Sequence, residues 1–300
     1  MNIHRKISKN MKKRKVAFYS IILQGCENVG EMKACLINLL PFIHELRPID
    51  RKEDLTTDRF CFLDDLQISD TGEYNKLLFK SARHSYRAPL LDRDTIGERD
   101  NPKKITEGEQ MKTHAVIRYF DDFILLVLEQ GSNCMTSGNI ARYLNRFLLK
   151  FNHKNPEQAI GGTFILQPVF KENFIEQLQA MNRVMKAVIY TDKRILGSDS
   201  LNYMERTSNV KEEVSINLSV KRGASMKDAI LDAWNKLVAG RTEITRIRVE
   251  GEGEHDEKTV INTEQFAKIE YMEVNQNEDT GEFVTPEVFN WMMLIAQRYV

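Results

Sequence analysis

The chain has 300 residues with 43 basic and 43 acidic side chains, so its formal net charge is zero. Hydrophobic residues make up 42% and charged residues 29%, as is typical of a globular protein that can bury a core. The longest apolar run, 123–128, is too short for a transmembrane helix, which takes about 20 residues. No secretory signal follows the basic N-terminus, and the four cysteines are widely spaced without a CxxC pair. These features favour a cytoplasmic protein with reduced thiols.

The charges are unevenly distributed along the chain. The first 16 residues contain seven basic side chains and no acidic one, and Lys12, Lys13 and Arg14 are among them. Residues 243–300 contain 13 acidic against 5 basic side chains. A basic segment on a nearly neutral body favours a polyanionic partner, although such a leader can equally be a solubilising tail. We expect residues 1–15 to form a flexible basic arm that contacts DNA.

Hydrophobic periodicity predicts an α+β fold of two lobes, with mixed or antiparallel sheets and amphipathic helices packed on them. The first lobe, 16–200, opens with a buried strand in KVAFYSIILQG and a helix that ends near Pro41. Strands follow in DRFCFLDDLQIS and YNKLLFKSARH. The polar segment 87–114 lacks periodicity, and a loop of that length in a compact domain is often functional or mobile. AVIRYFDDFILLVLEQG predicts a hairpin that turns at Asp121 and Asp122.

The segment 137–151 is the best-defined helix of the sequence, with Thr136 or Ser137 as its cap. Six apolar residues recur on one face at helical spacing, namely Ile140, Tyr143, Leu144, Phe147, Leu148 and Phe151. A strand in GGTFILQPVF, a helix in ENFIEQLQAMNRVMKA and a strand in AVIYTDKRIL complete the lobe. The polar residues 197–212 are the expected boundary between the lobes.

The second lobe is expected over 208–300. Its first helix starts at the S-x-x-D pattern of Ser225 and Asp228. TRIRVE then alternates, which places two apolar residues on one face and Arg246 and Arg248 on the other. Further strands are expected in TVIN and KIEYMEV before a last helix that begins at Thr285-Pro286. Trp291 lies off the apolar stripe of that helix and favours a homodimer paired through it.

Catalytic signatures are weak. The six histidines have no metal-binding spacing, and neither a nucleophile elbow nor a phosphate loop is present, so we predict no cofactor, no metal and no catalytic residue. A metal-dependent nuclease is the alternative, because such a site needs two or three carboxylates and a lysine on adjacent strands. Its candidates are Asp64, Asp65, Asp121, Asp122 and Glu129, with Glu31 and Lys33 in E-x-K spacing.

Nucleic-acid binding is the stronger signal. Opposite the apolar stripe of helix 137–151, Arg142, Arg146 and Lys150 recur every four residues, and Lys154 lies just beyond them. No acidic residue interrupts this stripe, so its cations can follow a phosphate backbone and release condensed counterions. A single charged stripe is otherwise most often a solvated helix face.

A second basic cluster lies at the junction of strand and helix in SINLSVKRGASMKDAILDAW. Lys221, Arg222 and Lys227 surround the helix N-terminus, where free N–H groups favour an anion. Asp228 competes for the same donors, so the junction can bind a phosphate or simply start a helix. We expect it to do both, with Arg246 and Arg248 extending the surface.

The order of these elements resembles that of a known family. The matching segments are FILLVLEQGSNCMTSGNIARYLNRFL, GGTFILQPVF, VSINLSVKRGASMKDAI and TRIRVEGEGEHDEKTVINTEQF, followed by a terminal helix. Their order and texture resemble the RexA family of phage-exclusion proteins, the cytoplasmic half of a two-gene exclusion system, although residues 87–114 match poorly.

The resemblance implies a two-lobed α+β protein that binds double-stranded DNA without sequence preference, self-associates and works with a membrane-protein partner. It supplies no catalytic residue. We therefore predict a DNA-binding protein of antiviral defence that is not an enzyme. The alternatives are a metal-dependent nuclease in the same setting and, third, a protein-interaction adaptor.

Overall fold

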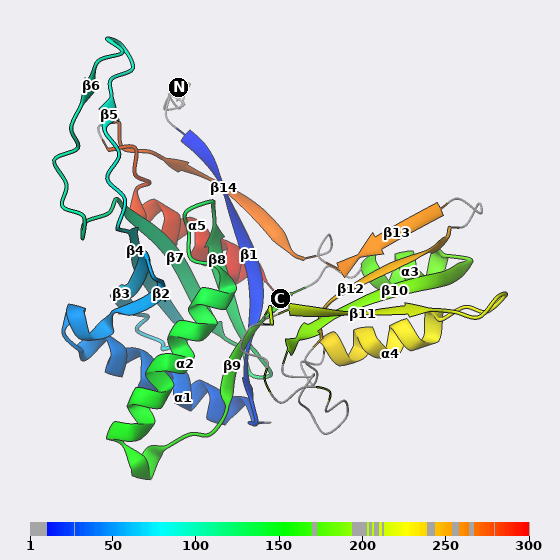
Figure 1. The fold of residues 1–300 in the computed structure, drawn as a ribbon. Coiled ribbons are helices and arrows are strands. Elements are labelled where there is room, and N and C mark those ends of the chain that lie inside the picture. Colours follow the sequence, from blue (N-terminus) through cyan, green and yellow to red (C-terminus); the bar gives the residue numbers. More distant parts are fainter. Residues whose placement is uncertain are drawn as a thin grey trace, which may run out of the picture. The chain divides into compact units, whose positions relative to one another are not determined.

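The computed structural model divides the chain into two compact units, Met1–Leu166 with Ile269–Val300, and Gln167–Lys268. The described residues are 11–26, 28–169, 173–193, 203, 206, 210–211, 213–238, 244–253, 258–263, 267–278 and 280–299. Helices and antiparallel sheets occur in both units, which confirms the predicted α+β class (Figure 1). Along the described part of the chain, no helix combines the length and apolarity that a membrane crossing needs.

The boundary between the units differs from the predicted one. Residues 197–212 fall inside the second unit, and the C-terminal segment belongs to the first. Strand β14 (Ile269–Asn275) pairs antiparallel with β1 (Met11–Gln24), and helix α5 (Thr285–Arg298) packs on strands β7 (Gln110–Tyr119) and β8 (Ile124–Gln130). This pairing joins the two ends of the chain, so no local pattern in the sequence indicates it.

The first unit is built on an eight-stranded sheet in the order β14-β1-β8-β7-β4-β3-β2, with β9 also paired to β1. The remaining strands are β2 (Glu53–Thr56), β3 (Arg59–Ile68), β4 (Tyr74–Arg83) and β9 (Thr163–Pro168). Neighbours along the main path run antiparallel. The turn between β7 and β8 contains Asp121 and Asp122, which confirms the predicted hairpin.

Helices cover both faces of this sheet. Helices α1 (Val29–Glu45) and α2 (Ser137–Lys154) share one core with alternate strand residues such as Leu126 and Leu128. The strand residues between them, Leu125 and Val127, are buried toward the other face, where α5 packs (Figure 1). Thr136 caps α2, as predicted. Helix α1 continues past Pro41 to Glu45, because burial of Ile43 and its neighbours outweighs the loss of one backbone donor.

Strand β1 begins at Met11, within the segment predicted to be a flexible arm. Lys12, Lys13 and Arg14 pair with residues of β14. The expectation of a flexible arm is therefore wrong for residues 11–15, because β14 supplies backbone partners that satisfy the strand despite its charges. Residues 1–10 lie outside the described residues.

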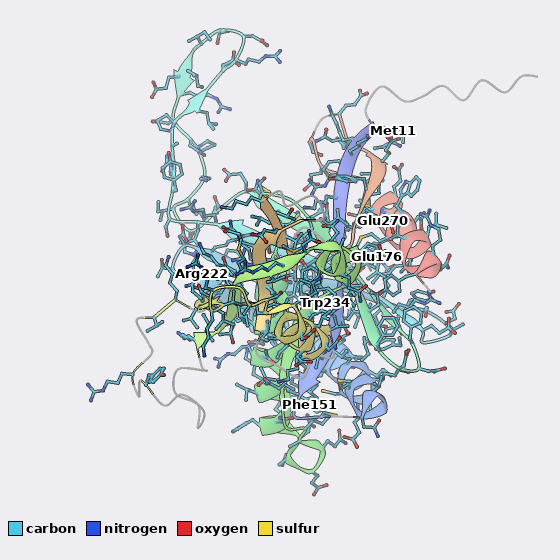
Figure 2. The ribbon with its side chains drawn as sticks, turned by 90° about the vertical axis from the view of Figure 1, so that its right-hand side faces the viewer. Met11, Phe151, Glu176, Arg222, Trp234 and Glu270 are labelled. Atoms are coloured by element: carbon cyan, nitrogen blue, oxygen red, sulfur yellow. The ribbon has the colours of Figure 1, made fainter. Side chains whose placement is uncertain are left out.

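The predicted loop 87–114 contains a β-hairpin. Strands β5 (Leu90–Leu91) and β6 (Glu98–Arg99) pair within a projecting segment, residues 85–109, that we call the β5–β6 arm (Figures 1 and 2). The carboxylate of Asp92 orders its turn by accepting the N–H groups of Asp94 and Thr95 at 3.0 and 2.8 Å. Residues 110–114 belong to β7.

The second unit is a four-stranded antiparallel sheet in the order β11-β10-β12-β13. Its strands are β10 (Arg183–Asp192), β11 (Glu213–Ser219), β12 (Ile244–Glu252) and β13 (Lys258–Asn262). Helices α3 (Asn173–Ala180) and α4 (Lys227–Val238) share one face, where the rings of Phe174 and Trp234 stack at 4.3 Å. The helix expected over 172–187 ends at Ala180, because residues from Arg183 onward pair with strands on both sides.

Candidate nucleic-acid interface

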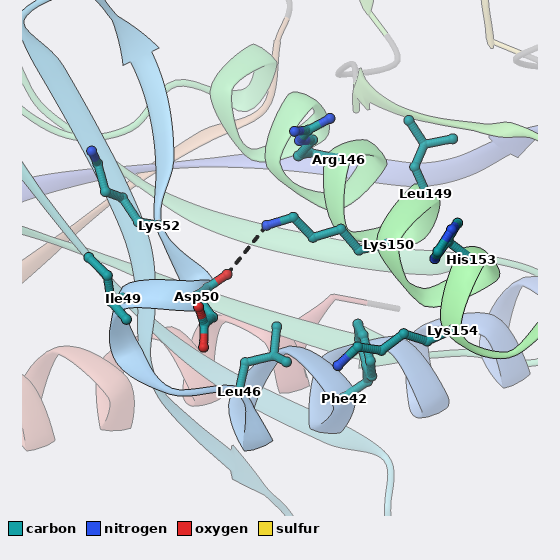
Figure 3. Close-up of a pocket in the computed structure, with 10 residues that line it drawn as sticks. All are labelled: Phe42, Leu46, Ile49, Asp50, Lys52, Arg146, Leu149, Lys150, His153 and Lys154. Atoms are coloured by element: carbon teal, nitrogen blue, oxygen red, sulfur yellow. Dashed lines mark hydrogen bonds between the residues drawn. The ribbon is translucent and has the colours of Figure 1, made fainter.

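The largest described depression of the first unit lies where α1 and α2 end beside the 3₁₀ helix η1 (Pro48–Arg51). It has a volume of about 780 Å³ and opens to solvent (Figure 3). It is lined by Phe42, Leu46, Ile49, Asp50, Lys52, Arg146, Leu149, Lys150, His153 and Lys154. We call it the basic groove.

Positive charge dominates the basic groove. Lys52, Arg146, Lys150 and Lys154 line it together with one carboxylate, that of Asp50. Arg47 donates to this carboxylate at 2.6 Å, and this hydrogen bond lowers the pKa of Asp50. Asp50 is thus ionised and already paired with an arginine outside the lining. The groove therefore keeps a surplus of positive charge.

The basic stripe of α2 faces outward as predicted, but acidic residues do approach it in space. The carboxylate of Glu53, on the adjacent β2, lies 3.6 Å from Nε of Arg142 and 3.7 Å from Nε of Arg146. Arg142 also donates to the backbone carbonyls of Asp54 and Leu55. Arg142 therefore anchors α2 to β2, and binding a phosphate would break those contacts.

The other cations of the stripe make weaker contacts. Lys150 Nζ reaches the backbone oxygen of Asp50 at 3.3 Å (Figure 3), and Lys154 Nζ lies 5.5 Å from the ring centre of Phe42. Arg146 keeps 56% of its side chain exposed. Because these contacts are long and exposed, the three cations can turn toward a ligand at small cost.

Sequence reasoning missed the wall of the groove that lies opposite α2. Lys52 comes from the turn before β2, and Ile49 from η1, far from α2 in sequence. No periodic pattern links these positions to the stripe. The only signal is local, since Pro48 favours the turn that follows α1.

The Lys221–Ser225 junction of the second unit is a tight turn. The N–H of Ala224 donates to the carbonyl of Lys221 at 3.0 Å, and Gly223 has φ +82°, as the third position of a type II turn requires. The hydroxyl of Ser225 accepts the N–H groups of Val184 at 3.1 Å and Lys227 at 3.4 Å. The serine thus fixes the start of α4 against β10.

The three lysine and arginine side chains predicted at this junction behave differently. Lys227 Nζ donates to the carbonyls of Gln179 and Met181, so it caps the end of α3 instead of facing a ligand. Lys221 and Arg222 are exposed, and within the described part of the chain no side-chain hydrogen bond or ion pair involves them. The junction therefore starts a helix and also presents two cations to solvent.

Arg246 and Arg248 lie on the sheet face opposite α3 and α4, as their alternation with buried Ile247 and Val249 predicts. Arg246 is engaged: its guanidinium lies 3.7 Å from the ring centre of Tyr190 and contacts Glu213 at 3.2 Å. Arg248 is exposed.

Arg248 shares a shallow depression of about 260 Å³ with Lys186 and Ser219. A neighbouring carboxylate, Glu250, has a lowered pKa through its hydrogen bond with Lys258, to which the charges of Lys186 and Arg248 add. Lys221 and Arg222 follow the end of β11 directly after Ser219. We call Lys186, Lys221, Arg222 and Arg248 the second basic surface.

Arg14 is not part of any DNA-facing arm. Its Nε donates to Glu129 at 2.8 Å, and its guanidinium lies 4.5 Å from the ring centre of Phe283. Glu129 also accepts Nδ1 of His114 at 2.7 Å, and Nε2 of His114 contacts the hydroxyl of Thr285 at 3.1 Å. This buried network joins β1, β8, β7 and α5. Lys12 and Lys13 remain exposed on β1.

The carboxylates considered for a nuclease lie apart. Asp64 pairs with Lys80 at 2.9 Å, Asp121 lies exposed in the β7–β8 turn, and Glu129 is held in the buried network. Over the described residues, no three histidine, cysteine or acidic side chains are placed to hold a metal ion together. Burial raises the pKa of Cys61 to about 12 and that of Cys134 to about 11, which keeps these thiols protonated.

Comparison of the chain with protein-family models gave no match, and comparison with curated proteins gave none either. The fold and the two surfaces define an α+β protein of two units, each with solvent-facing cations on a folded scaffold. Function is therefore inferred from the chemistry of these surfaces.

Proposed function

We propose that the protein binds double-stranded DNA through its phosphate backbone, without sequence preference, and that the basic groove is the principal contact. The observation that carries the proposal is the ring of Lys52, Arg146, Lys150 and Lys154 around a single carboxylate that is already paired. Such a surplus of exposed cations is what a polyanion needs in order to release its condensed counterions.

The geometry of α2 supports a backbone contact. Arg146, Lys150 and Lys154 recur every four residues, so they span roughly 12 Å of helix axis at 1.5 Å per residue. Duplex DNA carries one charge per about 1.7 Å of its axis, so several phosphates come within reach of these side chains. Contacts of this kind position a protein on DNA and carry no sequence information.

The second basic surface supports the same proposal. Lys221 and Arg222 are exposed beside the Ser225 cap, and Arg248 and Lys186 line a neighbouring depression. We propose that this surface adds phosphate contacts to those of the groove. The exposed Lys12 and Lys13 of β1 are a third, smaller source of positive charge.

The biological setting is proposed from the resemblance in element order. A cytoplasmic protein of phage exclusion or another antiviral defence, acting as a homodimer with a membrane-protein partner, fits a chain that binds DNA without reading its sequence. We propose binding without catalysis. The scattered positions of Asp64, Asp121 and Glu129 favour this over a nuclease.

Fluorescence anisotropy with two duplexes of unrelated sequence, with and without Mg²⁺, tests the proposal. We expect both duplexes to bind equally, with dissociation constants on the order of micromolar at physiological salt, and to remain intact. The absence of salt-sensitive binding would contradict DNA binding. Cleavage that requires Mg²⁺ and is lost in Asp64→Ala or Asp121→Ala would establish the nuclease instead.

A further inference from the structure

The β5–β6 arm exposes large apolar side chains that nothing in its own unit covers. Leu91 is 66% and Ile96 is 70% exposed, and Tyr86, Leu90 and Ile105 are exposed as well. The arm is nevertheless ordered by its own hydrogen bonds, such as those of Asp92 in the turn. Apolar side chains gathered on one projecting element indicate a contact surface.

The charge of the arm tip argues against DNA as its partner. Residues 90–101 contain the carboxylates of Asp92, Asp94, Glu98 and Asp100, but only two cations, Arg93 and Arg99. Arg93 is already paired with Asp94 at 3.0 Å. A surface with surplus carboxylates repels a phosphate backbone and requires a cationic partner.

The basic groove has the complementary chemistry. Its cations surround apolar side chains that are themselves exposed, including Ile49 at 68% and Leu149 at 65%. The arm tip offers apolar side chains flanked by carboxylates, and the groove offers apolar side chains flanked by lysine and arginine. The two surfaces therefore match in both charge and apolarity.

An arm cannot reach the groove of its own chain. The arm projects from the end of the first unit that lies away from the C-terminal half of α2, where Phe151 is labelled (Figures 1 and 2). The groove is formed beside that half of α2, by residues 146–154. Only the arm of a second copy can occupy it.

We propose that the β5–β6 arm of one copy docks into the basic groove of a second copy, with Leu91 and Ile96 on the apolar floor and Glu98 near Lys150. Self-association of this kind does not depend on DNA. Its regulatory consequence rests on the proposed function: if the same groove binds DNA, arm and DNA exclude each other. The free, self-associated protein then has its groove closed by its own kind.

A charge swap tests the contact. In sedimentation velocity over a concentration series, we expect Glu98→Lys and Lys150→Glu each to weaken self-association about fivefold, because an attraction becomes a repulsion. The double variant should recover most of the loss. Leu91→Ser should weaken association about tenfold through lost apolar burial. Asp70→Lys, an equally exposed reversal on the β3–β4 turn, should behave as the wild type.

Duplex binding by the same variants separates this proposal from the proposed function. Glu98→Lys should bind DNA at least as well as the wild type, whereas Lys150→Glu should bind less, and the swap should not restore DNA binding. Failure of all variants to bind DNA, with the swap pattern intact, would remove the function and leave the docking. A monomeric wild type, or Glu98→Lys that associates normally while Trp291→Ala does not, would overturn the docking.

Discussion

A residue's charge does not reveal its role until its neighbours are known, and Arg14 illustrates this. It is one of seven cations in the first 16 residues and looks like part of a DNA-binding arm. In the fold its side chain is only 22% exposed and contacts Glu129, whose side chain is 1% exposed. Residue type alone gives the charge, whereas burial and partners come from strand pairings that span the chain.

The buried network leads to a stability prediction. Glu129→Gln should lower the free energy of unfolding by about 3 kcal/mol at pH 7, because it leaves the guanidinium of Arg14 without its counter-charge. Urea denaturation of the two proteins measures the difference. Glu250→Gln is the matched control, since that carboxylate lies at the surface and should change stability little.

The same network predicts a pH dependence. Burial raises the pKa of Glu129, but the hydrogen bonds and charges of His114 and Arg14 outweigh it, so the folded pKa lies below the ordinary value of 4.5. The stability that Glu129 contributes is therefore complete above about pH 4.5 and is lost as the pH falls toward the folded pKa. The difference between wild type and Glu129→Gln should shrink below pH 4.5. A difference that stays constant down to pH 3 would exclude this carboxylate as its source.

Elements were predictable where their own residues carry the packing. Helix α2 and the β7–β8 hairpin bury regular stripes, so periodicity located both. The β5–β6 arm packs against nothing in its unit and therefore has no periodicity to read. The start of β10 was hidden because apolar residues from 184 onward fit a helix as well as a strand, and only pairing with β11 and β12 decides between them.

The Lys221–Ser225 junction gives a prediction at the scale of one element. Lys221→Ala with Arg222→Ala should reduce duplex affinity about tenfold or more, since each charge-assisted phosphate contact is lost, and should leave the melting temperature unchanged. Ser225→Ala should do the reverse, lowering stability by about 1 kcal/mol while DNA binding persists. If the double variant binds DNA as the wild type does, the junction is a helix start only.

At the scale of the whole molecule, the sequence predicted two units of the α+β class but not where they divide. The C-terminal strand and helix complete the first sheet, so removal of residues 269–300 would expose β1 and the core under α5. The basic groove likewise depends on distant segments, since Lys52 and α2 meet only through the fold. Half of the groove was readable from the spacing of α2, and the opposite wall was not.

The most direct test of the central claim is the salt dependence of duplex binding after removal of the groove cations. We expect the combined change of Arg146, Lys150 and Lys154 to glutamine to flatten the slope of log K against log salt by about 2.7, or 0.9 for each phosphate contact. A control that changes Lys76 and Lys236, which lie outside both basic surfaces, should keep the wild-type slope. Equal slopes for the groove variant and the wild type would contradict the assignment of the groove as the DNA site.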